Sequence, residues 1–193
     1  MRIRAFATIG LLLVSGCASQ EAPKKGAVTS YEAPGNLEST HALGCIPGSS
    51  VTAQYTPADL YPAFAKCVMA DRFAEATDLY AFAFAFAVYD TKRVPDKTAH
   101  QAIMVLQLEN MSALPDEKKR AFGEYFERVS VPGSPSATAI CDELRRVGPP
   151  QYEPRYMIQH GMGAASGQPS APPSDFDSAA TWSAVLKEQI RCG

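Results

Sequence analysis

Residues 73–90 read FAEATDLYAFAFAFAVYD, and this stretch decides the fold class. Its centre, AFAFAFA at residues 81–87, alternates as a β-strand would, so a strand competes with a helix here. A helix is favoured because alanine is the best helix former and Val88 is the only β-branched residue between Leu79 and Asp90. Apolar residues would occupy every face of this helix, which predicts that other helices surround it.

A further helix is predicted just upstream, where Thr56-Pro57-Ala58-Asp59 supplies a capping hydroxyl, a first-turn proline and a first-turn acid. The two helices together resemble one tetratricopeptide repeat. Four residues stand at the spacing of that repeat's second helix: Phe73, Ala76, Tyr80 and Ala83. The tryptophan, leucine and glycine of the repeat's first helix are replaced or missing, and no second copy follows at a period of about 34 residues. The resemblance therefore implies a repeat-like helical packing unit and not a repeat array.

Proline and glycine mark the ends of the other expected helices. Helix starts are predicted at Pro95, Pro115 and Pro135, and apolar residues recur at helical spacing between Asp175 and Cys192. We expect an all-α fold, an irregular bundle of about five to six helices stapled by disulfides. The helical domain would span residues 51–193 and include a loop at 148–174.

Residues 151–162 of that loop are rich in aromatic residues and methionine, without an extended helical period. A loop with this apolar content must either pack across the bundle or bind a partner. If a partner exists, we expect its contacts on six side chains, because aromatic residues, arginine and methionine are favoured at interfaces. These are Tyr152, Arg155, Tyr156, Met157, His160 and Met162.

The first 17 residues read MRIRAFATIGLLLVSGC, with two arginines, a short apolar run and small residues before Cys17. The apolar run is too short to cross a bilayer and suits a cleavable export signal. Val14-Ser15-Gly16-Cys17 resembles the lipobox of bacterial lipoproteins. That resemblance implies removal of residues 1–16 and acylation of Cys17 by fatty acids such as palmitate. With Ala18 following, it also implies an anchor in the outer membrane that faces the periplasm.

Residues 17–50 are rich in Ala, Pro, Gly, Ser and Thr and are expected to form a flexible, lipidated tether. The full chain carries 18 basic and 20 acidic residues. Loss of Arg2 and Arg4 with the leader would leave 16 against 20, a net charge of −4. This balance argues against a nucleic-acid partner and against an electrostatic grip on anionic lipid.

Four cysteines remain besides Cys17: Cys45, Cys67, Cys141 and Cys192. An even number in an oxidising compartment predicts two disulfides, and three pairings are open. We favour Cys45 with Cys67, which would tie the end of the tether to the first helix, and Cys141 with Cys192, which would tie the last helix to the body. The wide spacing of the cysteines argues against a metal site, and no cofactor is expected.

Catalytic motifs with known spacing are absent from the sequence, so a non-enzymatic protein is expected. Asp96 and His100 would share a helix face, and Arg93 and His160 could complete a polar pocket with Tyr156. We favour the simpler interpretation, in which Asp96 caps a helix and His100 is satisfied near the surface.

The segments KTAHQAI at 97–103 and RYMIQHGM at 155–162 resemble those of an uncharacterised proteobacterial lipoprotein family, which implies no activity. The function expected from these features is a membrane-anchored periplasmic lipoprotein that binds another protein without catalysis. One specific form is an immunity protein that blocks a secreted antibacterial effector. The alternatives are a structural or assembly lipoprotein of the envelope, and a small envelope hydrolase using Asp96, His100 and His160.

Overall fold

The computed structural model describes residues 33–168 and 173–193, which belong to one unit, Tyr31–Gly193. The described residues form helices and no strand, which confirms the all-α prediction. Six helices of eight or more residues lie in the predicted segments: α1 Pro57–Met69, α2 Phe73–Arg93, α3 Ala102–Ser112, α4 Asp116–Val129, α5 Pro135–Val147 and α8 Ser178–Val185. The helix start predicted at Pro95 is wrong, because α3 begins only at Ala102, after a short turn at Ala99–Gln101. Two four-residue helices, α6 Arg155–Ile158 and α7 Met162–Ala165, lie within the predicted loop. Three-residue turns occur at Gly48–Ser50 and Ala99–Gln101, and a five-residue π-turn follows α8 at Leu186–Ile190.

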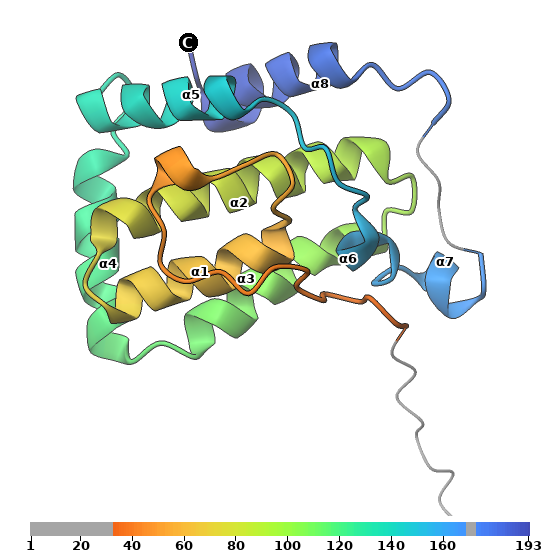
Figure 1. Cartoon of the computed structure of the whole chain (residues 1–193), viewed down its shortest axis with the longest axis horizontal. Coiled ribbons are helices and arrows are strands. Elements are labelled where there is room, and N and C mark those ends of the chain that lie inside the picture. Colours follow the sequence, from red (N-terminus) through yellow and green to blue (C-terminus); the bar gives the residue numbers. More distant parts are fainter. Residues whose placement is uncertain (1–32, 169–172) are drawn as a thin grey trace, which may run out of the picture. The chain divides into compact units, whose positions relative to one another are not determined.

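Helix α2 occupies the middle of the bundle, between α1 on one side and α5 and α8 on the other (Figure 1). The alanines of AFAFAFA let neighbouring helices approach closely, and Ala83, Ala85 and Ala87 are fully buried. Phe82 and Phe86 are buried as well, whereas Phe84 is only half-buried. The helical assignment of this stretch is therefore confirmed. Neighbouring segments enclose α2 as predicted, except along one stripe that includes Phe84.

Helix α1 begins as its sequence predicts. The Thr56 hydroxyl accepts from the Asp59 amide at 3.2 Å, and the Asp59 carboxylate accepts from the Thr56 amide at 2.8 Å. This reciprocal capping satisfies two amides that a helix N-terminus leaves without intrahelical partners.

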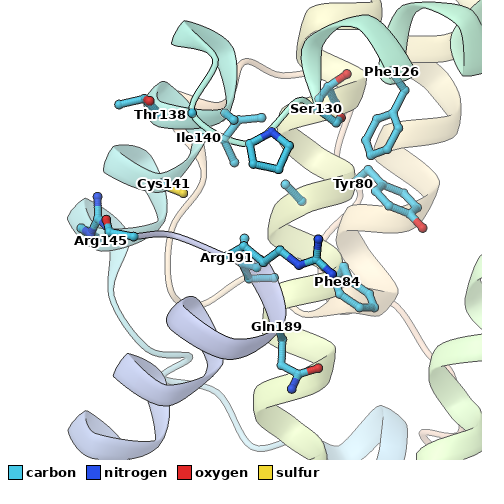
Figure 2. Close-up of a pocket in the computed structure, with 17 residues that line it drawn as sticks. Tyr80, Phe84, Phe126, Ser130, Thr138, Ile140, Cys141, Arg145, Gln189 and Arg191 are labelled. Carbon is cyan, nitrogen blue, oxygen red and sulfur yellow. The ribbon is translucent and has the colours of Figure 1, made fainter.

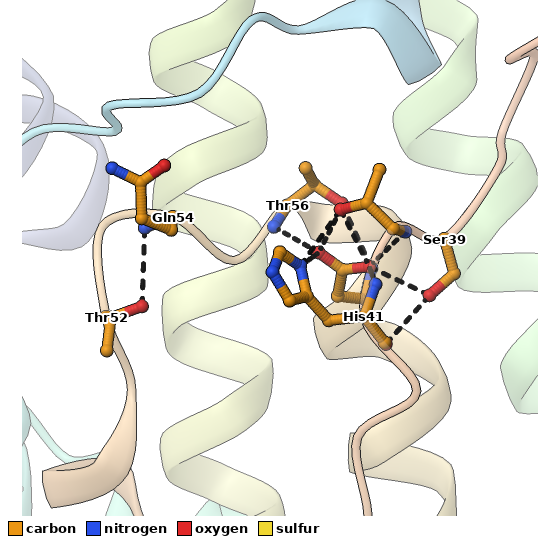
Figure 3. A network of polar contacts seen from close by, with 7 residues as sticks. Ser39, His41, Thr52, Gln54 and Thr56 are labelled. Carbon is orange, nitrogen blue, oxygen red and sulfur yellow. Dashed lines mark hydrogen bonds and ion pairs between the residues drawn. The ribbon is translucent and has the colours of Figure 1, made fainter.

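Asp59 also binds the segment that precedes the bundle, and Figure 3 shows Ser39 and His41 of that segment close to Thr56. Its carboxylate accepts from the Ser39 hydroxyl at 2.8 Å and from the Thr40 and His41 amides at 2.6 and 2.7 Å. Burial alone would raise the pKa of Asp59, but hydrogen bonds from the Thr56 and His41 backbones and from side chains outweigh it and lower the pKa. The carboxylate is thus charged at neutral pH, and it holds residues 39–41 against the start of α1.

The tether prediction for residues 17–50 is corrected by this packing. Residues 33–50 lie on the helical body: the Leu37 amide donates to the Tyr156 carbonyl at 3.1 Å, and Ala33 is 6% exposed. The sequence misled here because the segment has no helical or strand period, although its amides and hydroxyls find partners on the body. The leader 1–16 and the acylation candidate Cys17 lie outside the described residues.

Two disulfides connect the chain as we favoured. Cys45 is bonded to Cys67 of α1, and Cys141 of α5 is bonded to Cys192 after the π-turn. The second bridge fixes the C-terminal segment against α5 (Figure 1). Within the described ranges, none of the helices combines the length and the hydropathy needed to span a bilayer.

Candidate binding groove

The residues predicted for a catalytic pocket do not form one. Asp96 accepts from the Thr98 hydroxyl at 2.6 Å and the Gly163 amide at 2.9 Å, and its pKa is lowered by these bonds, first by that from Thr98. His100 Nε2 lies 2.8 Å from the Val94 carbonyl oxygen, and His160 Nδ1 lies 2.9 Å from Asn36 Oδ1. His100 is thus satisfied by a nearby backbone oxygen, as the simpler interpretation predicts. Asp96 does not cap a helix, because the N-cap of the turn at Ala99–Gln101 is Thr98, and Asp96 instead joins this turn to Gly163, 67 residues further along the chain.

The predicted partner-binding loop packs mainly inward. Tyr156 is 2% exposed and Met157 is fully buried, so the expectation that these two side chains offer contact area is wrong. Tyr152 and His160 are half-buried, and only Arg155 and Met162 are exposed. Of the two readings of this loop, packing across the bundle is the one that the structure shows.

The loop is held by Asp90, a residue that sequence reasoning did not select. Asp90 is fully buried near the end of α2 and accepts from the hydroxyls of Tyr152 and Tyr156 at 2.9 and 2.8 Å. Arg93 Nε donates to the same carboxylate at 2.8 Å, and the guanidinium lies 5.1 Å from the centre of the Tyr152 ring. Burial raises the pKa of Asp90, while Arg93 and the tyrosines act in the opposite direction. Arg93 and Tyr156 do belong to one polar cluster, but its centre is Asp90, and its role is to fix the loop.

A groove of about 550 Å³ lies along the incompletely covered stripe of α2 (Figure 2). Its floor comes from α2, through Thr77, Tyr80, Ala81 and Phe84. The walls come from the end of α4, the following turn, α5, and the C-terminal segment. Phe126, Pro132, Ile140 and Ile190 add apolar surface to these walls. A concave, mostly apolar cavity of this size with a few polar groups is typical of a binding site.

The charged side chains that line the groove are both basic. Arg145 comes from α5 and Arg191 from the C-terminal segment, and no aspartate or glutamate among the described residues lines the cavity. Arg145 is held by Asp142 at 3.1 Å and by the Gly193 backbone oxygen at 2.9 Å. Arg191 makes no side-chain hydrogen bond or ion pair with the described residues, and its side chain extends into the cavity (Figure 2). The groove therefore has one arginine, Arg191, that is exposed to solvent and pairs with no side chain of the described residues.

The backbone of Arg191 is left-handed, with φ of 64°. This conformation ends the π-turn and is usually taken by glycine, because a side chain there costs about 1–2 kcal/mol. The neighbouring Cys192 is disulfide-bonded to Cys141, which lies one helical turn before Arg145. The same bridge thus fixes the positions of both arginines at the groove.

Sequence reasoning missed this groove because its lining comes from four elements that are distant along the chain. Tyr80 was singled out for its repeat-like spacing, and the structure shows that it and Phe84, both half-buried, form part of the floor. Among the described residues, no cluster of three or more histidine, cysteine, aspartate or glutamate side chains could hold a metal ion.

Comparisons with known protein families, curated proteins and solved structures find no match to the chain.

Proposed function

We propose that the protein is a lipid-anchored, periplasm-facing binding module that holds a segment of another protein in the α2 groove, without catalysis. The groove carries the proposal, because apolar surface, hydrogen-bonding groups and an arginine without a side-chain partner converge there. The 151–162 loop instead packs on the helical body, where its tyrosines donate hydrogen bonds to Asp90.

The anchor part of the proposal rests on the lipobox before Cys17 and on an even number of remaining cysteines, paired as expected for an oxidising compartment. Sixteen peptide units separate Cys17 from Ala33, where the described body begins. A chain of that length reaches at most about 55 Å, so Ala33 lies within that distance of the lipid surface. Mass spectrometry of the membrane-extracted protein should find Cys17 as the acylated N-terminal residue. An unmodified cysteine in a freely diffusing product would contradict the anchor.

The binding part is tested by capture from detergent-solubilised envelope with wild-type protein and with Ala81→Trp, which fills the groove floor. Met104→Trp is the matched control, because Met104 lies on α3 outside the groove and is 57% exposed. A partner retained by wild type and by Met104→Trp, and lost with Ala81→Trp, is the expected result. Equal capture by all three proteins, or none by any, would contradict the proposal.

Two biological roles fit this proposal and differ in their genetics. For an immunity protein, deletion is harmless unless the gene for the matching effector is intact. For a structural or assembly lipoprotein, deletion weakens the envelope in every background. The hydrolase alternative has no support from the geometry, since Asp96, His100 and His160 bind separate structural partners.

A further inference from the structure

We propose that the segment bound in the groove is a short peptide with apolar side chains and a carboxylate, and that Arg191 binds this carboxylate. The inference rests on the proposed function and adds the chemistry of the partner. It follows from the charge of the lining, the dimensions of the floor and the polar groups on the walls.

The basic side chains of the groove favour a peptide that carries a carboxylate. The chain as a whole carries more acidic than basic residues, yet the described lining of the groove has two arginines and no acidic side chain. Arg145 already binds Asp142 and the Gly193 oxygen, which leaves the Arg191 guanidinium to pair with a ligand. A guanidinium binds a carboxylate through two parallel hydrogen bonds, and such bonds are stronger than those between neutral groups.

The length of the groove floor determines how many apolar residues of the bound peptide can contact it. From Thr77 to Phe84 the α2 stripe advances seven residues, which corresponds to about 10 Å along the helix axis. Three residues of extended peptide cover that distance at about 3.3 Å each. Two or three apolar side chains can therefore contact Tyr80, Ala81 and Phe84 while a terminal or adjacent acid reaches Arg191.

The walls favour a peptide over a fatty acid, although both combine an apolar part with a carboxylate. Ser130, Thr138 and Gln189 line the groove, and none of their side chains is hydrogen-bonded within the described part of the chain. A peptide backbone presents a donor and an acceptor at nearly every residue and can pair with these groups. An acyl chain has no backbone groups and offers these side chains no hydrogen-bonding partner along its length.

The backbone at Arg191 supports the same assignment. A non-glycine residue held in the left-handed region is destabilising, and such residues are concentrated at functional sites. Two other described non-glycine residues share this conformation, Leu37 and Asp71, but neither lines the groove. At position 191, the conformation places a long cationic side chain at an apolar cavity, next to a disulfide that fixes its position.

The test is selection of a random heptapeptide library on the immobilised full-length chain, followed by fluorescence anisotropy with the selected peptides. We expect enrichment of peptides in which two or three apolar residues lie beside an aspartate, a glutamate or the C-terminal carboxylate. Binding should weaken about tenfold or more with Arg191→Gln, since a charge-assisted hydrogen bond is lost. It should be unchanged with Arg120→Gln, which removes an exposed arginine of α4 that does not line the groove.

Removal of the Cys141–Cys192 bridge by double alanine substitution should also weaken binding, and removal of the Cys45–Cys67 bridge gives the matched control. Both variants are measured at a temperature where circular dichroism shows the native helix content, so that unfolding does not imitate a loss of the site. Enrichment of peptides that have no acidic side chain and still bind when their C-terminus is amidated, or equal affinity of wild type and Arg191→Gln, would overturn the inference.

Laurate is the competing probe for the fatty-acid alternative. Tight laurate binding that depends on Arg191, with no peptide enriched, would overturn the peptide assignment. Failure of the library selection alongside groove-dependent capture of a partner would refute the carboxylate chemistry and leave the proposed function standing. Failure of both experiments would remove the proposed function as well.

Discussion

Replacement of Tyr156 by phenylalanine should destabilise the protein by about 2 kcal/mol. The Tyr156 side chain is buried, and its hydroxyl donates to the fully buried Asp90 carboxylate at 2.8 Å. Hydrogen bonds to a charged group contribute about 1.5–3 kcal/mol. Asp90 keeps Tyr152 and Arg93 in the variant, so a value near the middle of that range is expected.

Urea unfolding at pH 7 with both disulfides intact gives the free energy of unfolding directly. In a thermal scan, a loss of about 2 kcal/mol corresponds to a melting temperature about 4–8 °C lower for a chain of this size. Tyr125→Phe is the control, since Tyr125 is half-buried and its hydroxyl has no hydrogen bond within the described residues. It should change stability by less than about 0.5 kcal/mol.

Tyr156→Ala extends the test, because it also removes a buried aromatic ring and should cost about 3–5 kcal/mol through the cavity alone. If Tyr156→Phe lowers stability by less than about 0.5 kcal/mol, the hydroxyl is not satisfying Asp90. If Tyr156→Ala leaves the melting temperature unchanged and weakens partner binding, the loop is an interface, and the assignment of the α2 groove is wrong.

Three further predictions concern other sites. Asp78→Asn should stabilise the protein at pH 7–8 by roughly 1 kcal/mol after allowance for solvent screening, and should have little effect near pH 4. Burial raises the pKa of Asp78 to about 6 in the folded state, so the ionised carboxylate destabilises the wild-type protein increasingly as pH rises from about 4 through 6. Urea unfolding of both proteins across this range measures the effect. A difference in unfolding free energy that stays the same at all pH values would contradict the prediction. Asp59→Asn should speed hydrogen exchange at the Thr40 and His41 amides, which donate to the carboxylate, while the amides in the middle of α2 stay protected; equal exchange in both proteins would show that Asp59 does not hold the segment. Arg191→Gly should raise the free energy of unfolding by about 1 kcal/mol, because glycine adopts the left-handed backbone without strain, and should reduce peptide binding; a less stable variant would argue against strain at this position.

The long helices could be predicted from the sequence because their signals are local. The capping residues of α1 and the apolar period of α2 each lie within a few turns, and both helices formed where expected. Helices α6 and α7 have four residues each, too few for a period to be recognised. The sequence left open whether their segment packs across the bundle or binds a partner, because the bonds that fix it join Asp90 to tyrosines 62 and 66 residues away.

Contacts between distant parts of the chain also explain the other differences between the prediction and the structure. Residues 39–41 have no regular pattern of their own, and they are ordered by Asp59, which lies 18–20 residues further along the chain. The groove depends on the way in which α2, α4, α5 and the C-terminal segment meet, and no stretch of sequence encodes that arrangement alone. The disulfide pairing could be predicted because each proposed bridge tied a terminal segment to the helical body, and both bridges are present.

Photo-crosslinking in intact cells tests the claim that the α2 groove is the binding surface most directly. A benzophenone amino acid would replace Thr138, which lines the groove, or Leu108, which is 60% exposed on α3 away from it. The account predicts one discrete adduct from position 138, lost when Ala81→Trp fills the groove, and none from position 108. An adduct at position 108 with none at position 138, or an adduct at 138 that persists with Ala81→Trp, would contradict it.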